Sequence, residues 1–229
     1  MKYIQSNADF YYGQSIHYYE KYKCKLSELS AFSDNKTYKV IKTLEDELKY
    51  KDLFHDSREY LYISIVFNAF AIEAFINLVG VTVFGNDVFF SEIERKNTFP
   101  KIRSIFHELK DDFDKHTEEK ELIELAFDLR HKLAHSKSKQ LDLIDIQNDI
   151  YHKFSPENLG KYTYEDIFDP LEELNWLAGN VEAAMSAYPN FKELVNKTLG
   201  YDIFEKQAEN LQRSIDYNIQ EMFKKGLGI

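Results

Sequence analysis

The stretch YLYISIVFNAFAIEAFINLVGVTV (Tyr60–Val83) carries one charge in 24 residues, and few folds can accommodate such a run. A segment of this length either crosses a membrane or forms the central helix of a protein core. Glu73, Asn68 and Asn77 lie inside it, and an acid near the bilayer centre costs about 2.5–3.5 kcal/mol on insertion scales. We therefore interpret the run as a buried core helix, with a membrane span as the alternative.

Helix-breaking residues are scarce along the whole chain. Its 229 residues include 8 Gly and 4 Pro, a composition that favours long helices and disfavours a turn-rich β-sandwich. Apolar residues recur at helical spacing through most of the sequence. We therefore predict an all-α fold, organised as a single all-helical domain over residues 1–229. The expected helices lie near residues 8–29, 37–52, 57–79, 87–96, 99–113, 117–136, 165–187, 190–199 and 201–225.

Local signals predict where some of these helices begin and end. The tetrapeptide DSRE (Asp56–Glu59) has an N-cap acceptor followed three residues later by Glu, which is typical of a helix start. Gly80 is expected to cap the end of the apolar helix. Apolar residues in Tyr201–Phe223 recur at helical spacing, and we interpret them as a core face rather than a docking face.

The cellular compartment follows from cysteine usage and from the first residues. The single cysteine, Cys24, excludes an internal disulfide framework and any Cys-based zinc cluster. Residues 1–14 lack the apolar region and the small-residue cleavage site of a signal peptide. We expect a cytoplasmic protein that does not associate with membranes.

The segment DLRHKLAHSKSK (Asp128–Lys139) differs in charge from the rest of the chain. The protein has a formal net charge of -10, yet the ten residues from Arg130 onward carry four basic side chains, two histidines and no acid. Lys132, Lys137 and Lys139 would hold phosphates, while the acidic remainder repels nonspecific polyanions. The alternative is an ordinary helix end, where cations are favoured by the helix dipole.

An ideal helix through this segment separates its side chains onto distinct faces, at about 100° per residue. The predicted core face consists of Leu122, Leu125, Ala126, Leu129 and Leu133. A smaller apolar strip beside Arg130 consists of Ile123, Phe127 and Ala134. Arg130 and His135 border one arc of the helix, with His131 between them. The small strip calls for a partner, either another helix of this chain or a second subunit.

The residues Arg130-His131-Lys132-Leu133-Ala134-His135 fit the R-x4-H motif of the HEPN superfamily (higher eukaryotes and prokaryotes nucleotide-binding). The preceding apolar helix, FAIEAFINLVG (Phe70–Gly80), is similar to the second helix of many HEPN domains. The resemblance covers about residues 57–140. It implies a HEPN-like antiparallel helical bundle with extra N- and C-terminal helices, in which 165–229 would be a helical extension.

The resemblance also implies an activity. Many HEPN proteins are metal-independent endoribonucleases that need no cofactor, act in toxin–antitoxin, phage-defence or stress systems, and work as homodimers with a composite active site. Carried over by position, Arg130 and His135 would be the catalytic pair and His131 the assisting polar residue. RNA would be the substrate, and an antitoxin or another regulatory protein a further partner. Toxins silenced by a nucleotidyltransferase usually carry Tyr two residues after the motif His, and this chain departs from that pattern with Lys137, which puts that form of regulation in doubt.

These residue types suit RNA cleavage by internal transfer. The reaction needs a base for the 2′-hydroxyl proton, an acid for the leaving oxygen and a cation for the phosphorane. Histidine titrates near neutrality, and arginine is a permanent bidentate phosphate donor. Glu73 and Asn77 share a helix face. They either orient Arg130 or His131, or form a buried hydrogen-bonding pair that only organises the core.

Two other classes of function remain open. A HEPN-like domain can serve as a non-catalytic module that binds RNA, a nucleotide or a protein. A metal site is the other alternative, because His131 and His135 are one helical turn apart, with Glu124 and Asp128 on the same arc. However, the HExxH order is absent and no third ligand is evident, so we predict no metal.

Overall fold

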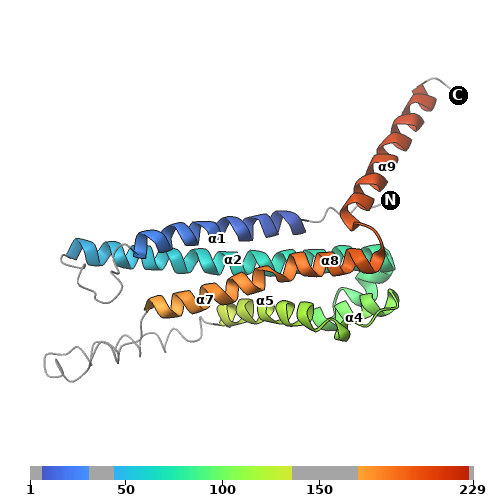
Figure 1. The fold of residues 1–229 in the computed structure, drawn as a ribbon. Coiled ribbons are helices and arrows are strands. Elements are labelled where there is room, and N and C mark those ends of the chain that lie inside the picture. The colour runs from blue at the N-terminus through green and yellow to red at the C-terminus, as the bar shows by residue number, and fades with distance from the viewer. Residues whose placement is uncertain (1–6, 31–43, 136–169, 227–229) are drawn as a thin grey trace. The chain divides into compact units, whose positions relative to one another are not determined.

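The computed structural model describes residues 7–30, 44–135 and 170–226, which form helices and contain no strand (Figure 1). The elements are α1 (Ala8–Ser30), α2 (Leu44–Phe84), α3 (Asn86–Val88), the π-helix η1 (Phe89–Ile93), α4 (Thr98–Glu108), the 3-10 helix η2 (Phe113–Lys115), α5 (Thr117–His135), α7 (Pro170–Met185), α8 (Ala187–Leu199) and α9 (Ile203–Gly226). The all-α prediction is therefore confirmed over these ranges. The finer expectation of a HEPN-like bundle stays a prediction.

The helices divide into two compact units, each assembled from separate segments of the chain. The motif unit comprises Asp9–Ala71 and Glu121–Ala187. The α4 unit comprises Met1–Ala8, Ile72–Lys120 and Tyr188–Ile229. The long helix α2 contributes its first part to the motif unit and its last part to the α4 unit.

Helix α2 replaces the two helices predicted near residues 37–52 and 57–79. It is continuous over 41 residues, from Leu44 to Phe84. The predicted helix start at Asp56–Glu59 is wrong, because Ser57 is buried inside the helix and its Oγ donates to the carbonyl of Leu53 at 2.7 Å. A capping box requires the unpaired backbone N–H groups of a first turn, and the preceding turn of α2 already occupies this position.

The helix end predicted at Gly80 is also wrong. α2 continues to Phe84 and ends at Gly85, whose φ of 78° suits glycine and whose N–H donates to the carbonyl of Val81 at 2.9 Å. Gly80 has a different role, because a Cβ at this position would lie 2.1 Å from the ring of Phe89. Glycine therefore allows the π-helix η1 to pack directly against α2.

The apolar run lies within α2, where the membrane alternative can be examined. Over residues 7–30, 44–135 and 170–226, one segment, Leu48–Phe84, is long and apolar enough to cross a membrane. Its most apolar 18-residue window is 61% buried by the chain itself. Asn68 is buried there, and its Nδ2 donates to the carbonyl of Ala184 at 2.8 Å. This burial favours the core-helix interpretation.

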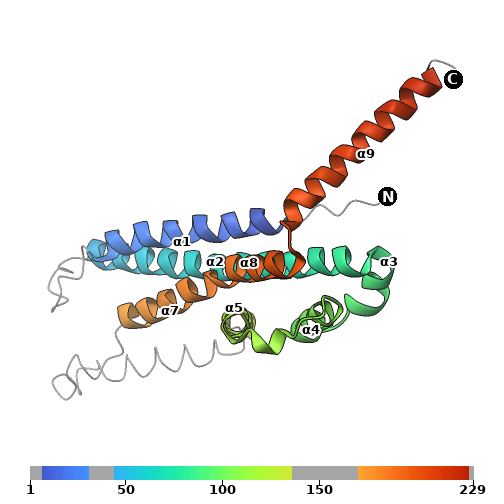
Figure 2. The same ribbon diagram turned by 45° about the vertical axis from the view of Figure 1, so that its right-hand side comes forward.

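In the motif unit, α1 runs along the first part of α2, and α7 contacts both helices (Figures 1 and 2). The hydroxyls of Ser15 and Ser64 each donate to the other residue's carbonyl at 2.9 Å. Tyr19 Oη donates to Glu182 Oε2 at 3.2 Å, which links α1 to α7. Two small serines at the α1–α2 crossing let the backbones approach closely enough for these reciprocal bonds.

An aromatic cluster forms the core of the α4 unit. The rings of Phe75 and Phe191 pack edge to face with centroids 5.8 Å apart. Phe113 lies 5.1 Å from Phe106 and 6.1 Å from Phe191. Edge-to-face and tilted pairs at these distances add stabilisation beyond the burial of their area. The cluster joins α2, α4, η2 and α8.

Helix α4 is shorter than the 99–113 segment predicted from the sequence. It ends at Glu108, and Lys110 has a positive φ of 61°. The N–H of Lys110 donates to His107 O, and the N–H of Asp111 donates to Phe106 O. This pair of bonds is a Schellman motif, which stops the helix without the glycine that would have signalled it.

The core interpretation of Tyr201–Phe223 is wrong for most of α9. The helix is capped by Asp202, whose Oδ1 accepts from the N–H groups of Phe204 and Glu205 at 2.8 and 3.1 Å. Ile203 is buried at its start. The exposed apolar side chains farther along are Leu211, Ile215, Tyr217, Ile219 and Met222.

Candidate active site

Helix α5 carries the R-x4-H segment and is helical from Thr117 to His135. Its buried side chains are Ile123, Ala126 and Leu129. Leu122, Leu125 and Leu133, which belong to the predicted core face, are only half-buried. The buried face is therefore turned toward Arg130, because Ile123 precedes Arg130 by about two helical turns.

Arg130 is half-buried and contacts an aromatic ring of α2. Its guanidinium carbon Cζ lies 5.3 Å from the centroid of Phe70, and both residues belong to the motif unit. Phe70 is 36% exposed, so the contact lies at the surface. A cation–π contact uses the positive charge of the guanidinium rather than a particular N–H group, so it is compatible with bidentate binding of a phosphate.

The neighbouring motif residues His131 and Lys132 are exposed. Glu124 and Asp128, on the preceding turns of α5, are exposed as well. The solvent side of this helix therefore carries acids before the basic end begins. An exposed imidazole at position 131 is accessible for the assisting role implied by the family resemblance.

Three predicted site residues lie at or beyond the limit of the structure. His135 is the last residue of α5, but its side chain lies outside the described part of the chain. Lys137 and Lys139 fall within 136–169, which is also outside it. Joint action of Arg130 and His135, and phosphate binding by the two lysines, therefore stay predictions.

Glu73 and Asn77 lie one turn apart in the part of α2 that belongs to the α4 unit, and both are half-buried. Asn77 Oδ1 accepts a hydrogen bond from Lys101 Nζ at 3.0 Å. Lys101 is only 6% exposed, and its ammonium lies 5.9 Å from the ring centroid of Phe89. Asn77 thus satisfies a buried cation, and this hydrogen bond joins α2 to α4. Support of the motif by Glu73 stays a prediction.

The apolar strip that suggested a homodimer is partly used within the chain. Ile123 is fully buried and Phe127 is half-buried. Ile123 therefore offers no surface to a second subunit. The homodimer stays a prediction, and its remaining basis is the composite site implied by the family resemblance.

A row of aromatic rings beside Arg130 was not expected from the sequence. The aromatic row consists of Tyr60, Tyr18, Phe67, Tyr11 and Phe70, with successive centroids 5.8–6.1 Å apart. The signal was present as spacing, because Tyr11 and Tyr18 are two turns apart on α1, as are Tyr60 and Phe67 on α2. Spacing alone could not show that the two pairs meet.

A group of three potential metal ligands occurs at His55, Asp56 and Glu59 on α2, with ligand atoms within 4.8 Å of one another. Asp56 Oδ2 also lies 3.8 Å from Lys25 Nζ. The Lys25 ammonium at this distance would compete with a metal ion for the Asp56 carboxylate. All three potential ligands come from a single helix, α2. The zinc alternative at His131 and His135 depends on a side chain that the structure does not describe.

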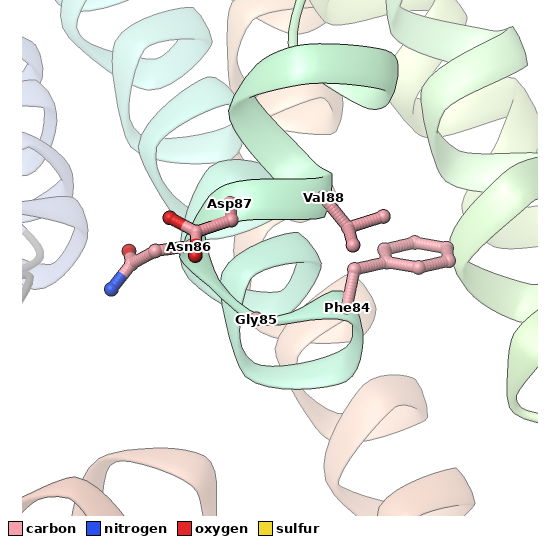
Figure 3. A pocket seen from close by; sticks show the side chains of 5 residues that line it. All are labelled: Phe84, Gly85, Asn86, Asp87 and Val88. Atoms are coloured by element: carbon pink, nitrogen blue, oxygen red, sulfur yellow. The ribbon is translucent and has the colours of Figure 1, made fainter.

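An open pocket in the α4 unit lies at the turn between α2 and α3 (Figure 3). Its lining residues are Phe84, Gly85, Asn86, Asp87 and Val88. Figure 3 shows the side chains of Phe84 and Val88 on one side and those of Asn86 and Asp87 on the other. Five consecutive residues with one ionisable side chain do not converge as catalytic groups must.

Comparison with known protein families, with curated proteins and with solved structures finds no match for this chain. The HEPN resemblance therefore rests on the R-x4-H segment and on the apolar helix that precedes it. The R-x4-H segment begins on α5, and the apolar segment lies on α2.

Proposed function

We propose that this protein is a metal-independent endoribonuclease of the HEPN type, acting in a toxin–antitoxin, phage-defence or stress response. The observation that carries the proposal is the placement of Arg130, half-buried against Phe70 near the end of α5. The R-x4-H spacing sets His135 at the last position of the same helix. Exposed His131 lies between them in the sequence.

Each residue has a defined role in the proposed reaction. The 2′-oxygen of the substrate attacks the adjacent phosphorus while the bond to the 5′-oxygen breaks, which leaves a cyclic phosphate and a free 5′-hydroxyl. His135 exchanges the protons that leave the 2′-hydroxyl or reach the 5′-oxygen. Arg130 stabilises the phosphorane charge, and its contact with Phe70 limits the reorganisation needed to do so. His131 assists at the same phosphate.

The proposal includes the assembly and partners implied by the family. The protein acts as a homodimer in the cytoplasm, with the two motifs forming one composite site. Lys132, Lys137 and Lys139 contact the RNA backbone and give binding its salt dependence. A regulatory protein or antitoxin restrains the activity until it is needed.

The decisive experiment is a cleavage assay on total cellular RNA, with and without EDTA. The parent protein should cleave RNA in both conditions, and Arg130→Ala/His135→Ala should not. Arg95→Ala/His107→Ala is the matched control, because it removes the same two residue types from exposed positions of the α4 unit. It should cleave like the parent.

Two outcomes would overturn the proposal. Cleavage by the Arg130→Ala/His135→Ala protein at the parental rate would exclude the motif as the active site. Intact RNA in every reaction, together with measurable RNA binding, would instead support the non-catalytic binding module.

A further inference from the structure

The aromatic row crosses α1 and α2 of the motif unit as a continuous series of rings. Phe70 lies 5.8 Å from Tyr11, and Tyr11 lies 6.1 Å from Phe67, measured between centroids. Phe67 is parallel to Tyr18 at 5.9 Å, and Tyr18 lies 6.1 Å from Tyr60. Adjacent rings therefore alternate between the two helices along the whole row.

A cation lies over a ring at each end of the row. Arg130 Cζ is 5.3 Å from the centroid of Phe70. Lys21 Nζ is 5.1 Å from the centroid of Tyr18 and 5.6 Å from that of Tyr60. Rings flanked by cations match a nucleic-acid strand, in which base faces alternate with negative phosphates.

The row reaches solvent, unlike the core of the same helix pair. Four of its rings are half-buried and Phe70 is exposed. Phe10 extends the row on α1, because it is 60% exposed and its centroid lies 5.8 Å from that of Tyr11. By contrast, Tyr22 and Leu61 are buried in the interior. The row is therefore an accessible rim of the α1–α2 pair.

Charged residues of both signs flank the Lys21 end of the row in the sequences of α1 and α2. On α2, Asp56 Oδ2 lies 3.8 Å from Lys25 Nζ, and Glu59 Oε2 lies 4.0 Å from His55 Nδ1. On α1, His17 and Gln14 precede Lys21 by one and two turns, and Glu28 follows it by two turns and lies 3.6 Å from Lys25. In a chain of net charge -10, acids that are paired with a cation repel a strand of phosphates less than unpaired acids would.

We propose that the aromatic row binds single-stranded RNA, with bases against Phe10 and Phe70 and with phosphates at Lys21 and Arg130. The inference rests on the proposed function, because Arg130 belongs to the catalytic motif, and it adds the path by which substrate reaches that motif. Unpaired bases are required, since bases stacked inside a duplex cannot offer their faces to a side chain. Stacking of this kind tolerates many sequences.

Binding can be measured separately from cleavage. A fluorescent 2′-O-methyl RNA about 12 nucleotides long suits a surface of this kind, and its blocked 2′-oxygen cannot attack the phosphorus. Fluorescence anisotropy with the full-length protein reports the dissociation constant. Phe10→Ala should weaken binding by about 5- to 150-fold, the usual loss of one base–aromatic stack. Lys21→Ala should reduce the slope of log affinity against log salt by about 0.7.

Matched variants separate stacking from folding. Phe10→Leu keeps an apolar side chain without a ring and should bind as weakly as Phe10→Ala, whereas Phe10→Trp should bind at least as tightly as the parent. Trp176→Ala removes a ring that is 62% exposed on α7, outside the row, and should leave the affinity unchanged. Melting temperatures of all variants should equal that of the parent.

Several results would overturn the inference. These are parental affinity in Phe10→Ala and Phe10→Leu, equal affinity for a duplex of the same sequence, or no affinity of the parent for RNA. The last result would leave the row as a protein-contact surface. Failure of the nuclease proposal alone gives a different result. The cleavage assay would then leave total RNA intact, while the anisotropy assay would still show weaker binding in Phe10→Ala. If Arg130→Ala/His135→Ala loses cleavage while the Phe10 variants bind RNA like the parent, the RNA-binding role of the aromatic row is rejected and the nuclease proposal is retained.

Discussion

The guanidinium carbon of Arg130 lies 5.3 Å from the centre of the Phe70 ring, although the two residues come from different helices. This contact joins the R-x4-H segment of α5 to the aromatic row on α1 and α2. It also holds the arginine in a defined place while the other motif residues, His131 and Lys132, remain exposed.

Exchanging Arg130 for lysine tests whether the planar fork matters. Arg130→Lys keeps the positive charge but loses bidentate donation and stacking. We expect the single-turnover cleavage rate at saturating RNA to fall by about 10²–10³-fold, as when one preorganised donor is removed. The free energy of unfolding should change by less than about 0.5–1 kcal/mol, the value of an exposed cation–π contact, because a lysine ammonium can also lie over the ring. The same exchange at exposed Arg95 should change neither quantity, and a parental rate in Arg130→Lys would exclude a bidentate role.

Gly80 should resist substitution because of the ring packed against it. In Gly80→Ala the new Cβ would lie 2.1 Å from the ring of Phe89, which is fully buried. Forcing the ring aside costs about 1–3 kcal/mol, more than the 0.5–1 kcal/mol that alanine contributes in a helix. Urea unfolding should therefore show a less stable protein, and Gly80→Ala/Phe89→Leu should recover part of the loss.

Gly179 on α7 is the matched control for Gly80. A Cβ at Gly179 would meet nothing within 4 Å. Gly179→Ala should therefore raise the free energy of unfolding by about 0.5–1 kcal/mol through helix propensity alone. Equal gains from both substitutions would contradict the close packing of η1 against α2.

Two tyrosines of α1 should respond oppositely to removal of their hydroxyls. Tyr19 Oη donates to Glu182 Oε2 at 3.2 Å, and burial, with Glu182 beside it, raises the pKa of Tyr19. Tyr19→Phe removes this hydrogen bond, but the carboxylate of Glu182 is exposed and can be hydrated, so we expect a loss of about 0.5–1.5 kcal/mol in the free energy of unfolding.

Tyr22 provides the contrasting case. The hydroxyl of Tyr22 is buried and has no hydrogen-bond partner among the residues that the structure describes. Burial raises the pKa of Tyr22 to about 12. Tyr22→Phe removes the unsatisfied group and should leave stability unchanged or raise it by about 1 kcal/mol. Chemical denaturation of both variants measures the difference, and a larger loss in Tyr22→Phe than in Tyr19→Phe would contradict this assignment.

Asp111 should make part of the stability depend on acid pH. The hydrogen bond from His116 at 2.9 Å, followed by one from the N–H of Asp112, lowers the pKa of Asp111. Because the folded pKa lies below the unfolded value of about 3.9, the stabilisation is fully present above that value. It is lost as the pH falls through the folded pKa.

Asp111→Asn removes this titration. Thermal melts from about pH 2 to pH 7 should show that the parent loses its advantage over Asp111→Asn progressively below about pH 4. His116→Ala removes the main cause of the lowered pKa of Asp111. The difference in melting temperature between the parent and His116→Ala should therefore also become smaller below about pH 4. Asp114 contributes acid sensitivity of the same sign in every variant, because hydrogen bonds from Arg103 and Lys120 lower its pKa. A constant difference between parent and Asp111→Asn across the range would contradict the linkage.

Helix ends show where local sequence signals succeeded and where tertiary contacts overruled them. The starts of α1 and α5 lie at the predicted positions, residues 8 and 117. The signals at Asp56–Glu59 and Gly80 pointed to breaks in α2 that do not occur. Ser57 is satisfied by Leu53 inside the helix, and Gly80 is required by the ring of Phe89. The sequence alone does not distinguish a glycine that ends a helix from a glycine that allows a neighbouring ring to pack closely.

The amino-acid sequence by itself determined the helical class, the central apolar helix and the placement of Arg130 near a helix end, because spacing and helix propensity are local properties. Only the tertiary structure decided that α1 meets α2 through Ser15 and Ser64, that Asn77 binds Lys101, and that five rings align beside Arg130. Periodicity specifies which face of a helix is apolar, but it contains no register between segments far apart in the chain. That register is set by how buried side chains from different helices fit together and satisfy one another's polar groups.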